Sequence, residues 1–197
     1  MKSAISSPVK GISALLLALA LPTATLAQTD EAALLASARQ VATEVPAKLL
    51  DVLNEQVVKE GVAGALNVCR ERAPAMAKAA SEQTGWGVRR VSLKNRNPKA
   101  VPDAWERSVL EDFDRRVAAG ETVSKIDAHA VVETDGRKEF RYMKALGVQR
   151  ICTACHGPAD GIKPDVMEQL RTHYPQDLAT GYTLGQVRGA ITLRKPL

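Results

Sequence analysis

Apolar residues recur three to four positions apart along the first part of the chain, and this spacing predicts amphipathic helices. The stripe runs through residues 30–60 and contains Leu34, Leu35, Ala38 and Val41. Pro46 is expected to kink or split this helix, because proline lacks the backbone N–H that a helix interior needs. A second helical stretch is predicted over residues 62–83, interrupted near Pro74.

The hydrophobic period then changes from helical spacing to alternation. Residues 88–93 predict a short strand and residues 104–119 predict a helix. Residues 125–134 and 138–145 predict two strands that flank a turn at Asp135-Gly136, and a last strand is predicted near residues 189–193. Helices followed by a hairpin and a closing strand indicate an α+β domain with an antiparallel sheet.

The first 27 residues have the pattern of a secretory signal peptide. Two lysines precede an apolar core from Ile12 to Leu21, and small residues end the segment at Ala27. The core is shorter than the roughly 20 apolar residues that span a bilayer, although an uncut anchor is the alternative. We therefore expect cleavage after Ala27, a single domain over residues 28–197, a periplasmic location and no membrane span in the mature protein.

Composition narrows the class of protein further. Hydrophobic residues make up 45% of the chain, which is enough for a core. The formal net charge is +5, and the signal peptide contributes two of the lysines. Basic residues do not cluster with aromatic ones, and aromatic residues make up only 4%. We therefore expect no binding of nucleic acid.

A C-x-x-C-H motif occupies residues 152–156 and carries the candidate chemistry. A structural zinc site needs four ligands, and only Cys69, His129 and His173 could complete one. A redox disulfide of the thioredoxin type needs a long helix after the motif, whereas the loop-like GPADGIKP follows here. Attachment of one covalent c-type haem fits best, with Cys152 and Cys155 as thioethers and His156 as the proximal ligand.

The sequence indicates less directly which residue would bind the iron on the side opposite His156. Three cysteines are an odd number, which leaves Cys69 unpaired. Its helical spacing from Ala65 and Leu66 predicts a thiol that points inward, either as a ligand or as an inert buried thiol. Arginines at positions 70 and 72 would favour a thiolate. The other candidates are Met76, Met143, Met167, His129 and His173, for which core packing or ordinary hydrogen bonding is the alternative role.

Four stretches of the chain resemble a family of secreted or membrane-displayed c-type haem domains with a PAS-like sensor fold. They are NVCRERAP at 67–74, VRRVSLKNRNPKAVPDAWE at 88–106, FRYMKALGVQRICTACHG at 140–157 and YPQDLATGYTLGQVRGAI at 174–191. The resemblance implies a PAS-like antiparallel sheet, with N-terminal helices packed around the covalently bound haem. It also implies that Cys69 is the haem ligand opposite His156.

These expectations favour a periplasmic sensor of redox state or of a small ligand. Thiolate ligation favours Fe(III), so release of Cys69 on reduction would open a site for CO or NO. A soluble electron-transfer cytochrome is the alternative, and a haem peroxidase or reductase is a third class; we predict no catalytic residue. The expected partner is a redox protein or a small-molecule ligand. Candidate cations for the haem propionates are Arg96, Arg89, Arg90 and Arg150.

Overall fold

The computed structural model describes Met1 and residues 23–197, with side chains described from Asp30 onward. Residues 2–22 of the expected signal peptide lie outside this range, so cleavage and export stay predictions. Among the described residues, no helix has the length and apolar character needed to cross a membrane.

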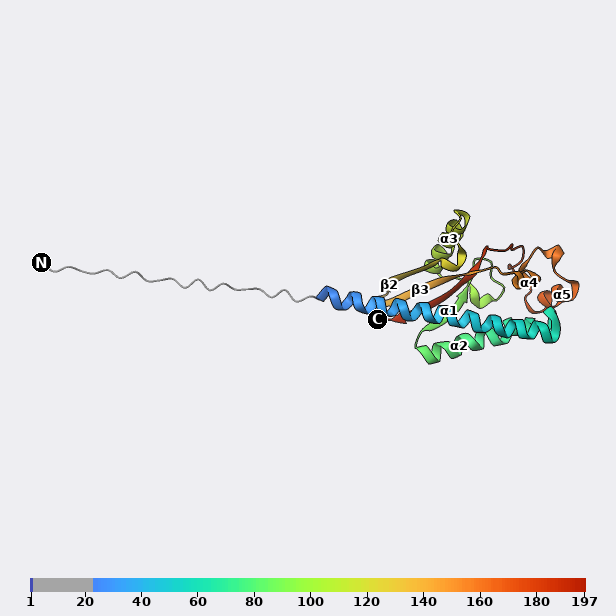
Figure 1. Ribbon diagram of the computed structural model, residues 1–197, viewed down its shortest axis with the longest axis horizontal. Coiled ribbons are helices and arrows are strands. Elements are labelled where there is room, and N and C mark those ends of the chain that lie inside the picture. The colour runs from blue at the N-terminus through green and yellow to red at the C-terminus, as the bar shows by residue number, and fades with distance from the viewer. Residues whose placement is uncertain (2–22) are drawn as a thin grey trace.

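Residues 23–84 are largely helical, as the apolar stripe predicts. Helix α1 (Thr23–Gly64) runs along one side of the molecule, and a short π-helix (Val68–Arg72) joins it to α2 (Ala73–Thr84) (Figure 1). Of the two effects expected of Pro46, a split is wrong, because the helix continues through this residue. The break lies instead at Gly61, whose φ of 73° is a left-handed conformation that glycine adopts without steric cost.

Four strands form one antiparallel sheet in the order β1-β4-β3-β2. Their bounds are Gly87–Val91 for β1, Asp127–Thr134 for β2, Arg137–Gly147 for β3 and Val187–Pro196 for β4. The predicted β2–β3 turn is confirmed at Asp135 and Gly136, which both have positive φ. The expected α+β class with an antiparallel sheet is therefore confirmed.

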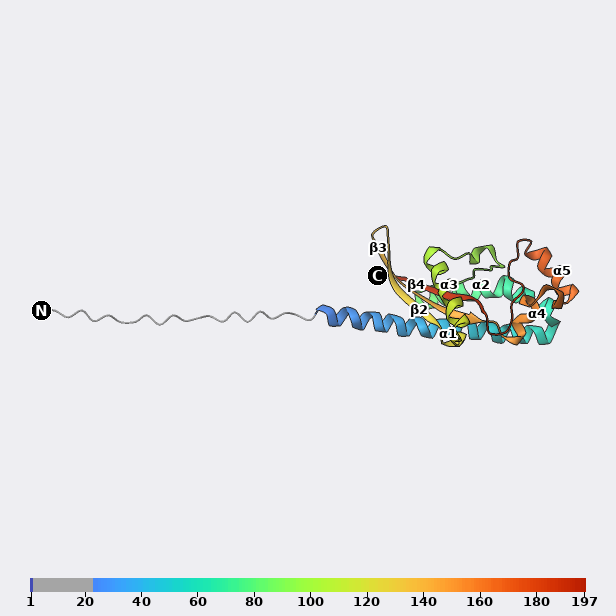
Figure 2. The same cartoon turned by 90° about the horizontal axis from the view of Figure 1, so that it is seen from above.

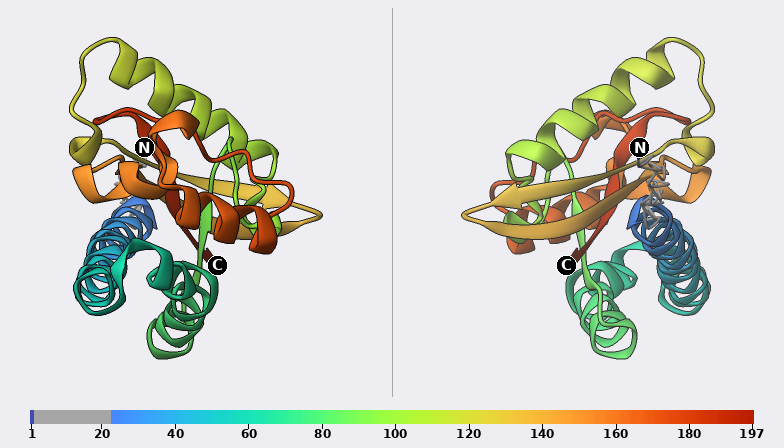
Figure 3. Two further views of the ribbon diagram at one scale, coloured as in Figure 1. Left: turned by 90° about the vertical axis from the view of Figure 1, so that its right-hand side faces the viewer. Right: turned by 90° about the vertical axis from the view of Figure 1, so that its left-hand side faces the viewer.

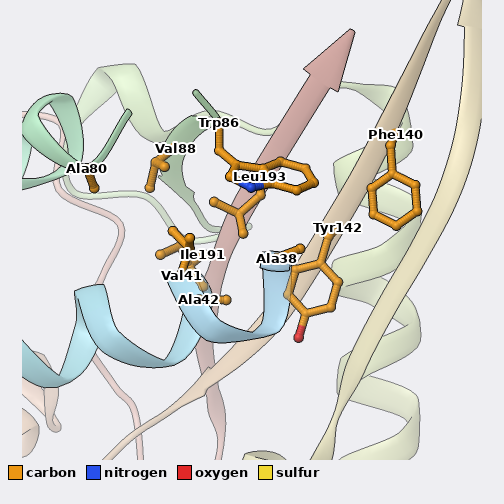
Figure 4. Packing of buried hydrophobic residues seen from close by; sticks show 10 residues of the cluster. All are labelled: Ala38, Val41, Ala42, Ala80, Trp86, Val88, Phe140, Tyr142, Ile191 and Leu193. Carbon is orange, nitrogen blue, oxygen red and sulfur yellow. The ribbon is translucent and has the colours of Figure 1, made fainter. Parts of the chain in front are cut away.

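Helices cover both faces of this sheet. Helices α1 and α2 lie on one face, and α3 (Ala104–Ala118) lies on the other (Figure 3). Side chains alternate along β3 accordingly: Tyr142 belongs to the cluster beside α1, whereas Met143 belongs to the cluster beside α3. Figure 4 shows the first cluster, in which Ala38 and Ala42 of α1 approach the aromatic rings of the sheet.

Two further helices gather at the end of the molecule where α1 ends (Figure 2). Helix α4 (Thr153–His156) is the C-x-x-C-H motif, and α5 (Pro164–His173) packs Val166 and Leu170 near the end of α1. The hydrophobic spacing did not predict a helix at residues 164–173, where only Val166 and Leu170 are buried. This end of the fold brings the motif next to the π-helix.

Candidate functional site

A cavity with two lobes lies between the π-helix region, strands β1 and β4, and the C-x-x-C-H motif. The lobes have volumes of about 180 Å³ and 340 Å³, and together they fall within the roughly 300–1,000 Å³ typical of small-molecule sites. Cys69 and His156 line both lobes. Leucine and valine side chains from α1 form an apolar wall of the first lobe, namely Val45, Leu49, Leu50, Leu53 and Val57.

The motif presents its three functional side chains from a single turn of helix. Cys152 immediately precedes α4, and Cys155 and His156 are its last two residues. Spacing of three and four residues places side chains on one face of a helix, and all three line the first lobe. Burial raises the pKa of the Cys155 thiol to about 11, so this sulfur is uncharged at neutral pH.

His156 is held in one tautomer by the loop that follows α5. Its Nδ1 lies 2.7 Å from the carbonyl oxygen of Ala179, and a carbonyl oxygen can only accept, so Nδ1 carries the proton. Burial, together with the charges of Arg188 and Arg96, lowers the pKa of His156 to about 2. The imidazole is therefore neutral, and its Nε2 lone pair is available to a metal.

Cys69 lies within the π-helix, a conformation that is uncommon in proteins and frequent at functional sites. The expectation of an inward-pointing thiol packed beside Ala65 and Leu66 is corrected by the structure. Those two residues are buried, whereas Cys69 is exposed and lines both lobes of the cavity. The wide turn of the π-helix changes the helical register, so the thiol is presented to the cavity rather than to the core.

Of the other candidate ligands, only Met76 lines the cavity. Met143 is buried beside α3, and Met167 packs against the α5 cluster. His129 stacks on Phe140, and His173 contacts Arg70. The structure therefore brings Cys69 and Met76 to the motif and leaves the remaining candidates elsewhere.

The zinc and disulfide interpretations find no support in the described part of the chain. All three cysteines are free there. Within residues 30–197, histidine, cysteine and acidic side chains nowhere gather in a group of three that could hold a metal ion. The motif also lies on a four-residue helix instead of at the start of a long one.

The predicted arginines take different roles in the structure. Arg96 is buried and paired with Asp177 at 2.9 Å, and it donates to the carbonyl oxygen of Cys155 at 2.6 Å. Arg89 pairs with the fully buried Glu106 at 2.5 Å. Arg90 lines both lobes. Arg150 is exposed and is not among the residues that line the cavity.

The sequence analysis missed Arg188, which lines both lobes. Along β4, Ala190 belongs to the α3 side, so strict alternation would place Arg188 there as well. However, the pairing with β3 skips Arg188, because Leu146 pairs with Gly189 and Gly147 pairs with Val187. This β-bulge turns the Arg188 side chain into the cavity.

Comparison with known proteins agrees with this architecture. A family model described as Tll0287-like matches residues 23–196. Among solved structures, the chain is similar to the cyanobacterial heme-protein Tll0287, with a TM-score of 0.61 and 22% sequence identity over 85% of this chain and 95% of that chain. At this identity the likeness shows the fold. No curated protein matches the chain.

Proposed function

The chain belongs to the Tll0287-like family, and from this premise we propose that it is a haem protein that senses redox state or a small ligand. In this proposal Cys152 and Cys155 hold one c-type haem covalently. His156 and Cys69 would bind its iron. The N-terminal signal pattern supports a periplasmic location for the mature protein in this proposal. Membership of this family confirms the type of haem-domain family that the four sequence stretches resemble.

One observation carries the proposal: Cys152, Cys155 and His156 of the C-x-x-C-H motif line one lobe of the cavity together with the distant Cys69. The two thiols of the motif match the two vinyl groups of a haem, and the next residue is the histidine. The apolar α1 wall suits the porphyrin face. The solved structure with the similar fold is itself a heme-protein.

A bound haem would supply one-electron chemistry and an iron that binds small ligands. The chain contributes the environment for this group. The Ala179 carbonyl orients His156 so that Nε2 can bind. The uncharged, half-buried Cys155 sulfur suits conversion into a neutral thioether.

We expect Cys69 to be the ligand that leaves the iron and is replaced by a small molecule. Its thiol comes from a segment distant from the motif and would bind only the iron, so it could leave the iron without disturbing the two thioethers. The backbone around it is a π-helix, a conformation that is frequent at functional sites. An exchangeable thiol beside a fixed histidine is the arrangement that a sensor needs.

The test is optical and EPR spectroscopy of the purified holoprotein in the ferric and ferrous states. We expect a low-spin ferric thiolate signature that disappears in Cys69→Ala and persists in the control Met76→Leu. We also expect the reduced wild type to bind CO. An unchanged spectrum in Cys69→Ala would refute thiolate ligation. A reduced protein that stays six-coordinate and refuses CO would refute sensing and favour an electron-transfer cytochrome.

A further inference from the structure

The second lobe of the cavity has a strongly positive lining. Six of the described residues that line it are cationic and none is acidic; the six are Lys78, Arg89, Arg90, Arg96, Lys99 and Arg188. The first lobe likewise has no aspartate or glutamate among its described lining residues. A cavity with this lining attracts anions and repels cations.

Three of the six cations are already neutralised by the protein. Arg96 pairs with Asp177, Arg89 pairs with Glu106, and Lys78 lies 3.4 Å from Glu82. In contrast, Arg90, Lys99 and Arg188 form no ion pair with any residue in the range 30–197. The two guanidinium groups among these, Arg90 and Arg188, line the same two lobes, and the charge of Arg90 helps to lower the pKa of Arg188. The lobe therefore contains two guanidinium groups with no acidic partner.

Arg188 is the more informative of the two, because its side chain is only 8% exposed. Its Nη1 donates to Ser92 Oγ at 2.9 Å and to the Lys94 carbonyl at 3.2 Å. Its Nε is buried and has no acceptor. Burial, reinforced by Arg90, lowers the pKa of Arg188 to about 10. Burying a charge without a counterion is costly, and protein structures rarely leave one uncompensated.

The backbone geometry of β4 keeps Arg188 in this position. The β-bulge turns the side chain away from the α3 side and into the cavity. The bulge depends on Gly189, whose φ of 151° excludes other residues; an added Cβ would overlap the Val91 carbonyl oxygen. A strand that is distorted to expose an unpaired guanidinium to a cavity indicates a ligand of opposite charge.

We propose that Arg188 and Arg90 form an anion-binding site in the second lobe, which takes a carboxylate or a small oxyanion. Guanidinium groups suit both, because their N–H donors match the two oxygens of such groups. Two kinds of anion with this chemistry could occupy the site. One is a carboxylate of a bound haem, and the other is a small anion that enters from solvent. The first rests on the proposed function, whereas the second does not.

The experiment compares wild type with Arg188→Gln and Arg90→Gln, and with Arg150→Gln as a matched control outside the cavity. Two quantities are measured on the purified protein. One is the midpoint potential of the haem between pH 5 and 9. The other is the rise in unfolding temperature during titration with inorganic phosphate, at an ionic strength held constant with sodium chloride.

If haem carboxylates occupy the site, Arg188→Gln lowers the midpoint potential and changes its pH dependence, and phosphate has no saturable effect. If a free anion occupies it, phosphate raises the unfolding temperature of wild type saturably, and Arg188→Gln and Arg90→Gln each weaken this binding at least about tenfold, the loss of one charge-assisted contact. Arg150→Gln matches wild type in both cases. Arg188→Lys, which keeps the charge but not the planar fork, is expected to fall between wild type and Arg188→Gln.

The proposal is overturned if both quantities are the same in Arg188→Gln, Arg90→Gln and Arg150→Gln. If Arg188→Gln does not fold, Arg188→Lys and Arg90→Gln still decide the question. If the purified chain contains no haem, the proposed function fails, but the phosphate titration still tests the anion site. The two failures can therefore be told apart.

Discussion

His156 Nδ1 lies 2.7 Å from the carbonyl oxygen of Ala179, and the backbone N–H of Tyr182 donates to the carbonyl oxygen of His156 at 2.9 Å. The loop at residues 177–182 thus holds both the ring and the backbone of the histidine. The loop itself is anchored, because Asp177 accepts from the Ala179 N–H at 2.8 Å and pairs with Arg96. The orientation of the candidate iron ligand therefore depends on a buried ion pair.

That dependence predicts the effect of Asp177→Asn. The change leaves the buried Arg96 charge without its partner, and breaking a buried pair costs about 3–5 kcal/mol. We expect chemical denaturation to show a loss of unfolding free energy of this size. The matched control is Asp112→Asn, whose contacts with Arg115 and Arg116 are exposed and worth less than about 1 kcal/mol. Equal effects of the two changes would contradict the anchoring role.

Covalent attachment of the haem is tested through the motif cysteines. We expect the Cys152→Ala/Cys155→Ala double variant to release all haem when it is denatured, because no thioether remains. The measurement is haem staining of a denaturing gel. Cys69→Ala serves as the control and should keep its stained band, since its thiol is expected to bind only the iron. Stain retained by the double variant would exclude these two sulfurs as the attachment points.

Gly189→Ala tests the β-bulge. The added Cβ would overlap the Val91 carbonyl oxygen and lie 3.1 Å from the Ser92 Cβ, so β1 and β4 would have to separate. We expect a loss of about 2 kcal/mol or more of unfolding free energy. Gly185→Ala is the control: its φ of 82° is also positive, but the added Cβ meets nothing within 4 Å, which leaves only about 1–2 kcal/mol of backbone strain. A milder effect at Gly189 than at Gly185 would show that the bulge tolerates a side chain.

The ionisation of Asp127 makes the free energy of unfolding depend on pH in the acidic range. Burial opposes its charge, but hydrogen bonds from Arg39 and Tyr142 outweigh burial and lower the pKa of this carboxyl below its usual 3.8. The folded state therefore gains stability from Asp127 above pH 3.8 and loses it as the pH falls through 3.8 toward the lower folded value. We expect Asp127→Asn to reduce the unfolding free energy at pH 7 by about 1.5–3 kcal/mol, the range for hydrogen bonds to a charged group.

The measurement is urea unfolding of wild type and Asp127→Asn between pH 2.5 and 7. The gap between the two proteins should be widest above pH 4 and should narrow below it. Asp51→Asn, a change on the exposed side of α1, should follow wild type throughout. A gap that stays constant with pH would mean that the Asp127 contacts do not depend on its charge.

Sequence patterns predicted the helices and strands in which the spacing of apolar residues continues without interruption. Alternation located β2 and β3, and helical spacing located α1 and α3, because regular elements bury one face against a neighbour. The α+β class followed from their order. The C-x-x-C-H motif also pointed to Cys152, Cys155 and His156, which line one cavity, because its chemistry needs only local spacing.

The patterns failed where the backbone departs from a regular period. The π-helix exposes Cys69, although its spacing from Ala65 predicted burial. The β-bulge brings Arg188 into the cavity, whereas uninterrupted alternation from Ala190 would have placed it on the α3 side. Arg150 was a reasonable candidate by proximity to the motif in sequence, but it is exposed away from the cavity. Such departures depend on tertiary contacts, and a single sequence does not reveal them.

The strand order also has a consequence for the order in which the chain folds. In the described part of the chain, strand β1 joins the sheet only through β4, and α3 and the β2–β3 hairpin separate the two strands in the sequence. Pairing across so long a loop is slow compared with local contacts. The cavity wall that carries Arg188 therefore forms late in folding, and until then the sulfurs of Cys152 and Cys155 lie in an open chain that a haem-attaching enzyme can reach.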